Sequence, residues 1–264
     1  MIFAIPFPQI DPVLISFGPV AIRWYSLAYL AGLLLGWRLL RRLAGRSPAV
    51  ADDAQVDDFL IWATLGIVLG GRLGYVLFYN WAYYLDNPMA ALAVWRGGMS
   101  FHGGLIGVIL ATLVFCRRRG IDLWLFSDRV ACVSPIGLFF GRLANFINGE
   151  LFGRVTDAPW AVVFPRGGPD PRHPSQIYEA LMEGALLFLV LWWLAGNEKH
   201  RRRAGFLTGV FMVGYGAARM VAELFRQPDA HLGFLSFGST MGQWLSVPLL
   251  AFGAYLIFRS RPET

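Results

Sequence analysis

The sequence is most informative at residues 141–154, GRLANFINGELFGR, where a hydrophobic segment ends in polar side chains. The polar residues of this stretch are Arg142, Asn145, Asn148, Glu150 and Arg154. Polar and ionisable side chains are costly in lipid, so a membrane protein keeps them in a hydrophobic segment chiefly for function. The stretch predicts a membrane fold with a functional site near the end of one helix.

The composition is typical of an integral membrane protein. Hydrophobic residues make up 56% of the chain and charged residues only 15%, against about 25% charged residues in soluble domains. Seven apolar runs can cross a bilayer core of roughly 30 Å as helices; they cover residues 20–37, 59–79, 99–116, 130–148, 176–195, 205–223 and 239–258. We expect an all-α fold, one polytopic domain over 1–264 with a periplasmic loop region at 149–175. Pro135 should kink the fourth helix.

Basic residues follow alternate helices and predict the orientation. The clusters are Arg38, Arg41, Arg42 and Arg46; Arg117, Arg118 and Arg119; Lys199, Arg201, Arg202 and Arg203; and Arg259 and Arg261. All of them fall on one side of a seven-span arrangement, which the positive-inside rule assigns to the cytoplasm. The N-terminus is then outside and the C-terminus inside. The net charge of +6 resides largely in these short, separate clusters, which argues against a nucleic-acid surface.

The polar residues within the helices are expected to meet at one depth. With a rise of about 1.5 Å per residue, Arg72, Arg142 and Arg219 each lie roughly 20 Å from the cytoplasmic side. The helices that enter from outside carry further polar residues in their first turns: Arg23, Tyr25, His102, Glu179 and Glu183. We infer a polar, water-accessible cavity in the outer half of the membrane.

Structural roles remain open for several of these residues. Tyr215, Arg219, Glu223 and Arg226 form one helical stripe, in which Arg219 and Glu223 could simply be an intrahelical ion pair. Arg72 could pair with Glu179 or Glu183. We expect the outer-loop residues Arg154, Arg166 and Arg172 to be solvated surface residues.

Two or more arginines in a site of low dielectric constant suit an anion, because planar guanidinium groups bind phosphate bidentately. At this depth the anion would be a lipid phosphate. The residues alone indicate a phospholipid-using enzyme or a lipid transporter and do not choose between them.

Six ordered segments resemble the bacterial prolipoprotein diacylglyceryl transferases. They are FPQIDPVLISFGPVAIRWYSLAYLAG (7–32), GGRLGYVLFYN (70–80), GGMSFHGGLIGV (97–108), GRLANFINGELFGR (141–154), RHPSQIYEALMEG (172–184) and FRQPDAHLG (225–233). The resemblance implies transfer of the diacylglyceryl group of phosphatidylglycerol to the lipobox cysteine of prolipoproteins, with release of glycerol phosphate. It also implies a site facing the outer leaflet of the bacterial cytoplasmic (inner) membrane, and no metal, cofactor or nucleic acid.

The resemblance suggests a role for each candidate residue. Arg142 would take the lipid phosphate, Arg219 would stabilise the leaving group, and His102 would be the base for the thiol, with Tyr25 within reach. Asn145 would orient the headgroup, Glu150 would hold Arg142 or Arg154, and Gly153 would allow close backbone approach. Glu223 completes the expected substrate-binding set: Tyr25, Asn145, Glu150, Gly153 and Glu223.

Two alternatives use other chemistry. A lipid or small-anion transporter would use the same arginines without covalent change. A phosphatidyl-alcohol synthase would need an Asp-rich metal site, for which Asp52–Asp53 and Asp57–Asp58 are the candidates, although a solvated loop and a helix start fit them better. A retinal protein is excluded because the sole lysine, Lys199, lies in a loop.

Overall fold

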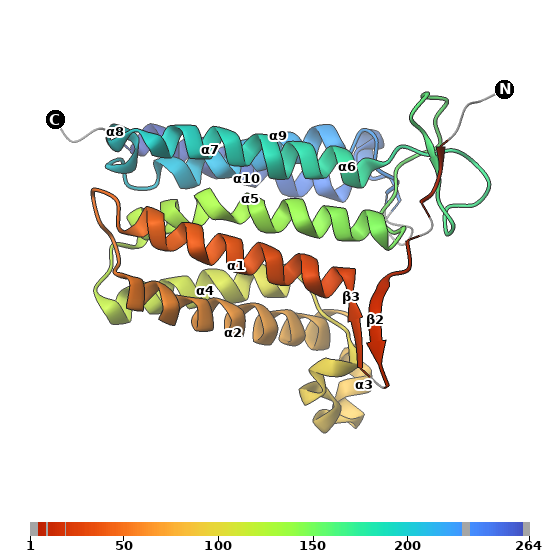
Figure 1. Cartoon of the computed structure of the whole chain (residues 1–264), viewed down its shortest axis with the longest axis horizontal. Helices are drawn as coiled ribbons and strands as arrows, with labels where there is room; N and C mark the ends of the chain where they lie inside the picture. The colour runs from red at the N-terminus through yellow and green to blue at the C-terminus, as the bar shows by residue number, and fades with distance from the viewer. Residues whose placement is uncertain (1–4, 9, 19, 229–232, 261–264) are drawn as a thin grey trace. The chain divides into compact units, whose positions relative to one another are not determined.

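A computed structural model describes residues 5–8, 10–18, 20–228 and 233–260 (Figure 1). Arg261 and part of the 225–233 segment lie outside these residues. The described chain is mostly helical and forms two compact units, Met1–Leu39 with Asp128–Thr264, and Leu40–Ser127. Its long or apolar helices are α1 (Trp24–Ala44), α2 (Asp53–Phe78), α4 (Phe101–Arg119), α5 (Leu123–Ile147), α6 with η3 and α7 (Ser175–Gly196), α9 (Phe206–Ala222) and α10 (Met241–Arg259).

The long helices agree with the expected membrane character. Five of them are long and apolar enough to cross a bilayer: α2, α4, α5, α10 and the continuous helix Ser175–Gly196. The helix α9 is apolar but shorter. The protein is therefore a multi-pass membrane protein. The fourth predicted helix starts earlier than expected, at Leu123, and α5 continues through Pro135.

The N-terminal segment differs from its prediction. Residues 20–23 were expected in the first helix, but β2 (Val13–Phe17) and β3 (Val20–Arg23) form an antiparallel hairpin, and α1 begins only at Trp24. The apolar run is continuous through Ile22, so hydropathy alone does not separate a β-branched strand from the helix that follows. A second pairing joins β1 (Ile5–Pro6) to β4 (Val162–Val163) in parallel.

Glycines bring the helices of the first unit close together. A Cβ atom at Gly32 of α1 would lie 3.1 Å from the Gly137 Cα of α5, and one at Gly209 of α9 would lie 2.7 Å from the carbonyl oxygen of Gly253 in α10. The helices α9 and α10 run side by side (Figure 1). Small residues at such crossings let membrane helices approach through their backbones.

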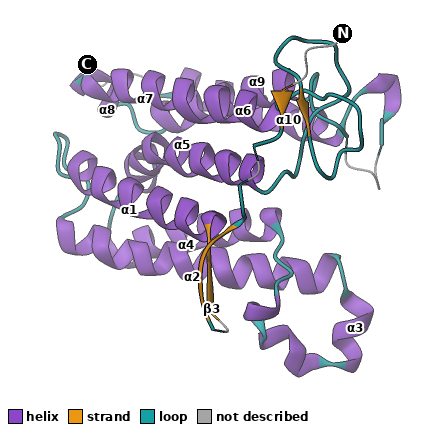
Figure 2. Ribbon diagram, turned by 45° about the vertical axis from the view of Figure 1, so that its right-hand side comes forward, coloured by secondary structure: helices purple, strands orange, loops and turns teal. Residues whose placement is uncertain are grey.

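The second unit is built on the pair α2 and α4, which lie side by side in Figures 1 and 2. Gly66, Gly70 and Gly74 of α2 face Gly103 and Gly107 of α4 so closely that a Cβ atom would overlap the opposite backbone. The acidic pairs lie at the start of α2, as expected: Asp52 is its N-cap in a capping box with Gln55, and Asp53 and Asp58 form ion pairs with Arg41 and Arg119.

Three short helices connect α2 to α4: α3 (Trp81–Asp86), η1 (Pro88–Leu92) and η2 (Val94–Arg96). They form a separate knob beyond the end of α2 (Figure 2). In the first unit, α8 (Glu198–Arg201) and η4 (Ser236–Gly238) are similarly short connections.

Candidate functional site

Arg142 lies near the C-terminal end of α5 and is held by two carboxylates. Its Nη1 is 2.8 Å from Glu179 Oε2, and its Nη2 and Nε are 3.1 and 3.3 Å from Glu183 Oε2. Both glutamates are fully buried, and the Arg142 side chain is 14% exposed. The guanidinium group is therefore fixed in orientation and only partly accessible.

The helix that carries the glutamates packs directly against α5. A Cβ atom at Gly184 would lie 2.6 Å from Phe139 Cβ and 3.0 Å from the Phe139 backbone nitrogen. Phe139 lies almost one turn before Arg142, so this contact brings Glu183 to the arginine. The same stretch, Ala180–Leu186 (η3), is π-helical, a distortion found frequently at functional sites. It was not predicted.

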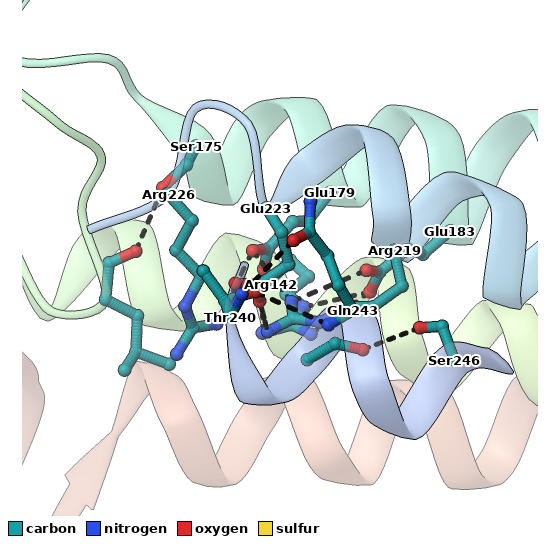
Figure 3. A network of polar contacts seen from close by, with 12 residues as sticks. Arg142, Ser175, Glu179, Glu183, Arg219, Glu223, Arg226, Thr240, Gln243 and Ser246 are labelled. Carbon is teal, nitrogen blue, oxygen red and sulfur yellow. Dashed lines mark hydrogen bonds and ion pairs between the residues drawn. The ribbon is translucent and has the colours of Figure 1, made fainter. Parts of the chain in front are cut away.

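The end of α9 adds two further arginines to the cluster. Arg219 Nη1 lies 3.0 Å from Glu179 Oε1, and its Nη2 pairs with Glu223 one turn along the helix. Arg226 follows the helix and reaches the same Glu179 oxygen at 3.4 Å. Figure 3 shows these side chains converging from α5, α6 and α9. The intrahelical ion pair of Arg219 with Glu223 is confirmed. The predicted stripe of Tyr215, Arg219, Glu223 and Arg226 is not one continuous helical face, because α9 ends at Ala222 and Arg226 joins the cluster from beyond it.

The ionic cluster, defined as Arg142, Arg219, Arg226, Glu179, Glu183 and Glu223, balances three cations against three carboxylates. Burying these charges is tolerable only because every one is paired. An arriving anion must therefore compete with a glutamate for guanidinium N–H groups, or add a negative charge to a neutral site.

A second polar group lies one turn further along α5. Asn145 Nδ2 donates to Glu150 Oε1 at 2.8 Å, and Asn148 Nδ2 donates to the same oxygen at 3.3 Å. The Tyr25 hydroxyl of α1 lies 3.4 Å from the Tyr29 hydroxyl and is close to Asn145 and Glu150. The expected pairing of Glu150 with Arg142 or Arg154 is wrong: the carboxylate binds asparagine amides instead, because Arg142 is already held by Glu179 and Glu183.

Gly153 permits close backbone approach, as predicted, but the approaching backbone is the protein's own. Its N–H donates to the His173 carbonyl at 2.8 Å. A Cβ atom at Gly153 would lie 2.6 Å from both His173 Cβ and the Phe225 carbonyl oxygen. The loop that follows α5, within the segment 141–154, thus packs against the chain that follows α9.

Of the three outer-loop arginines, Arg166 is exposed, as expected, whereas Arg154 and Arg172 are structural. Arg154 donates to the carbonyls of Glu223 and Arg226 at 2.9 and 3.0 Å and so satisfies the C-terminal end of α9. Arg172 donates to the carbonyls of Gly167 and Gly153 at 2.8 and 3.3 Å. The solvated-surface default was wrong for both. Burial and the nearby Arg154 lower the pKa of His173 below its usual range.

His102 and Arg72 lie in the second unit. His102 is in the first turn of α4, exposed, with its ring edge-on to Phe101. In the part of the chain that the structure describes, Arg72 donates its hydrogen bonds to the backbone carbonyls of Ala90, Ala91, Gly97 and Gly98. The sequence left open that Arg72 pairs with the carboxylate of Glu179 or Glu183. In the structure Arg72 binds these backbone carbonyls instead.

Two supporting residues were missed by the sequence analysis. Gln176 Nε2 donates to the Glu150 carbonyl at 2.6 Å and holds the loop after α5. Gly242 of α10 leaves room for the Glu223 carboxylate, since a Cβ atom there would lie 2.7 Å from Glu223 Cδ. Gln176 falls inside the quoted segment 172–184, so its position was a usable signal, whereas nothing in the sequence relates Gly242 to Glu223.

The site residues lie in segments that match a known family over nearly the whole chain. The family model described as prolipoprotein diacylglyceryl transferase matches residues 12–259. The chain belongs to the prolipoprotein diacylglyceryl transferase family. It is 60% identical over 258 residues (97% of this chain, 96% of the relative) to a protein of Paramagnetospirillum magneticum named phosphatidylglycerol–prolipoprotein diacylglyceryl transferase.

Two further relatives carry the same name. The chain is 58% identical to the Rhodospirillum rubrum protein, with 99% of this chain and 96% of the relative covered. It is 53% identical to the Rhizobium meliloti protein, with 97% and 94% covered. Membership of the diacylglyceryl transferase family therefore extends over the ionic cluster, Tyr25, Asn145 and His102 alike.

Proposed function

We propose that this protein transfers the diacylglyceryl group of phosphatidylglycerol to the lipobox cysteine of prolipoproteins, the first step of bacterial lipoprotein maturation. The observation that carries the proposal is the convergence of Arg142 and Arg219 on the buried pair Glu179 and Glu183, in a chain of the diacylglyceryl transferase family. These arginines present fixed, partly desolvated donors, the arrangement that stabilises charge developing on a phosphate.

The reaction is a displacement at carbon. The cysteine sulfur forms a bond to the glyceryl carbon, the bond from that carbon to the phosphate oxygen breaks, and glycerol phosphate leaves. The thiol proton leaves the sulfur and is balanced by protonation of the released phosphate monoester. Attack requires thiolate, and a free thiol with a pKa near 8.5 is mostly protonated at neutral pH. Deprotonation and leaving-group stabilisation are thus the two tasks of the protein.

Each candidate residue takes one part of these tasks. Arg142 binds the phosphate, Arg219 stabilises charge on the leaving group, and His102 accepts the thiol proton. Tyr25 and Asn145, of which Asn145 is held by Glu150, orient the headgroup. Glu223 and Gly153 position Arg219 and the outer loop through the contacts described above.

The charge balance of the ionic cluster suggests how phosphate enters. Two donor groups of Arg142, Nη2 and Nε, bind Glu183 at 3.1 and 3.3 Å. Both distances are longer than the 2.8 Å between Arg142 Nη1 and Glu179. The Glu183 contacts are the weaker ones by distance. We infer that the lipid phosphate takes over these donors while Glu179 keeps Arg142 in place.

We further propose seven membrane crossings, formed by α1, α2, α4, α5, the helix Ser175–Gly196, α9 and α10. The basic clusters put the N-terminus outside and the C-terminus in the cytoplasm. The arginines at the ends of α5 and α9 then face the outer leaflet of the cytoplasmic membrane, where the phosphate of phosphatidylglycerol lies. Lipid and prolipoprotein are the partners, with no role for nucleic acid or a metal.

The purified protein, a lipobox peptide and phosphatidylglycerol vesicles test the proposal, with the peptide followed by mass spectrometry. A diacylglyceryl mass gain on cysteine with released glycerol phosphate supports it. If the peptide stays unmodified while the folded protein moves fluorescent phosphatidylglycerol between leaflets, the result would favour a transporter that uses the same arginines.

A further inference from the structure

The knob between α2 and α4 exposes a row of large apolar side chains. Met89, Leu92 and Trp95 are 76%, 67% and 80% exposed. Met89 and Leu92 are three apart in the 3₁₀ helix η1, where side chains at this spacing eclipse one another. Trp95 lies in η2, after a break in the helix at Ala93. Within the knob, the intervening Ala93 is buried instead. We call these three exposed residues, Met89, Leu92 and Trp95, the ridge.

A buried arginine of α2 binds the backbone of the ridge segment. Arg72, 5% exposed, donates through Nε to the Ala91 carbonyl at 2.8 Å and through Nη2 to the Ala90 carbonyl at 2.7 Å. Its Nη1 donates to the carbonyls of Gly97 and Gly98 at 2.6 and 3.1 Å. Two of these carbonyls lie between Met89 and Leu92 in the chain, and the other two follow Trp95. Arg72 thereby ties the backbone of the ridge segment to α2.

The place of the knob along α2 matches a membrane boundary. From Phe59, just after the acidic pair Asp57–Asp58, to Phe78 the helix is long enough for the roughly 30 Å of a bilayer core. The knob starts just beyond Phe78, and the hydrogen bonds of Arg72 hold the carbonyls of Ala90 and Ala91 beside the last turns of α2. The ridge thus lies at about the depth to which interfacial helices bury their apolar faces.

The helix α2, which precedes the knob, has an exposed apolar face of its own. Large apolar side chains of α2 are exposed along its whole length: Ile61, Leu65, Leu69, Leu73 and Phe78. In a helix that crosses the membrane, this face contacts lipid. Tyr79, Trp81 and Tyr83, also exposed, add the aromatic side chains that gather at membrane interfaces.

We propose that Met89, Leu92 and Trp95 insert into the boundary between lipid headgroups and acyl chains at the Phe78 end of α2, and that Arg72 is the positioning residue that holds them there. The ridge binds a lipid surface and does not depend on the transferase reaction. It anchors the outer end of the α2 and α4 pair against the bilayer.

Spin labels test the insertion. Met89→Cys and Trp95→Cys are labelled with a nitroxide in the full-length protein in phospholipid nanodiscs, after Cys116 and Cys132 are changed to alanine. The control is Asp86→Cys, an exposed polar position of the same knob. We expect oxygen, which partitions into lipid, to relax the labels at 89 and 95 more strongly than a water-soluble nickel chelate does, with the order reversed at 86.

Two results would overturn the insertion. Stronger relaxation by the nickel chelate at 89 and 95 would place the ridge in water. Weak relaxation by both reagents would mean that protein covers it, either a second copy or another part of the chain.

The role of Arg72 has its own test. Arg72→Lys keeps the charge but cannot reach all four carbonyls at once. We expect it to abolish the lipid pattern at 89 while a label at Ile61→Cys, in the lipid-facing part of α2, keeps its oxygen-dominated relaxation. An unchanged pattern at 89 would remove the positioning role.

Discussion

The carboxylate of Glu179 lies 2.8 Å from Nη1 of Arg142, and the glutamate has no exposed surface. The same carboxylate contacts Arg219 at 3.0 Å and Arg226 at 3.4 Å. One buried side chain of α6 therefore joins α5 to α9 and sets the geometry of all three arginines. This makes Glu179 the centre of the ionic cluster.

Glu179→Gln should destabilise the fold. Removing one partner of a buried ion pair leaves uncompensated charge, at a cost of about 3–5 kcal/mol, measurable as a fall in the thermal unfolding midpoint in detergent. The matched control is Glu198→Gln, which breaks the exposed pair with Arg202 and should cost roughly 0.3–0.5 kcal/mol. Equal effects of the two variants would contradict a central structural role for Glu179.

Arg219→Lys should lower turnover strongly while the protein stays folded. An ammonium group cannot contact Glu179 and Glu223 together and still present a planar fork to the leaving group. Loss of one such donor costs about 10²–10³ in turnover at comparable sites. Steady-state kinetics with phosphatidylglycerol vesicles measure it. Near-normal turnover would reduce Arg219 to a charge partner of Glu223.

His102→Gln should depress turnover most at neutral pH and recover part of it at alkaline pH. Without a base, the reaction depends on thiolate that forms spontaneously, and its fraction rises as pH approaches the thiol pKa near 8.5. A pH–rate profile of variant and wild type measures the recovery. A constant ratio between the two across the pH range would argue for a binding role instead.

Gly153→Ala should destabilise the loop after α5. Its new methyl group would lie 2.6 Å from His173 Cβ and from the Phe225 carbonyl oxygen, and such overpacking costs typically 1–3 kcal/mol. Gly196→Ala is the matched control, since in the described part of the chain no heavy atom beyond its own helix and chain neighbours would lie within 4 Å of the added methyl group. The midpoints of chemical unfolding of the two variants distinguish these effects. A Gly153→Ala midpoint equal to that of wild type would show that the loop can accommodate the methyl group.

Helical periodicity and hydropathy predicted the long helices well because lipid imposes one simple rule, a continuous apolar run. The same rule failed at Val20–Arg23, where an apolar strand runs without interruption into α1. Spacing along one helix correctly aligned Arg219 with Glu223, since residues four apart share a face, whereas Arg226 reaches the cluster from beyond the end of α9.

The contacts made by the loop after α5 could not be derived from helical spacing. Glu150 binds Asn145 and Asn148 rather than an arginine, and Arg154 binds backbone carbonyls at the end of α9. Both outcomes depend on loop geometry after α5, including positive φ angles at Gly149 and Leu151. No pattern of residue types encodes that path, so the contacts become visible only in three dimensions.

The most direct measurement compares Arg142→Ala with wild type by mass spectrometry of a lipobox peptide incubated with phosphatidylglycerol vesicles. Arg142→Lys retains the charge at this position, and Arg202→Ala serves as an exposed control. We predict a diacylglyceryl mass gain and released glycerol phosphate for wild type and Arg202→Ala, and neither product for the two Arg142 variants, although both insert into the membrane and fold. Transfer near the wild-type rate by folded Arg142→Ala would contradict the assignment of the lipid phosphate to this site.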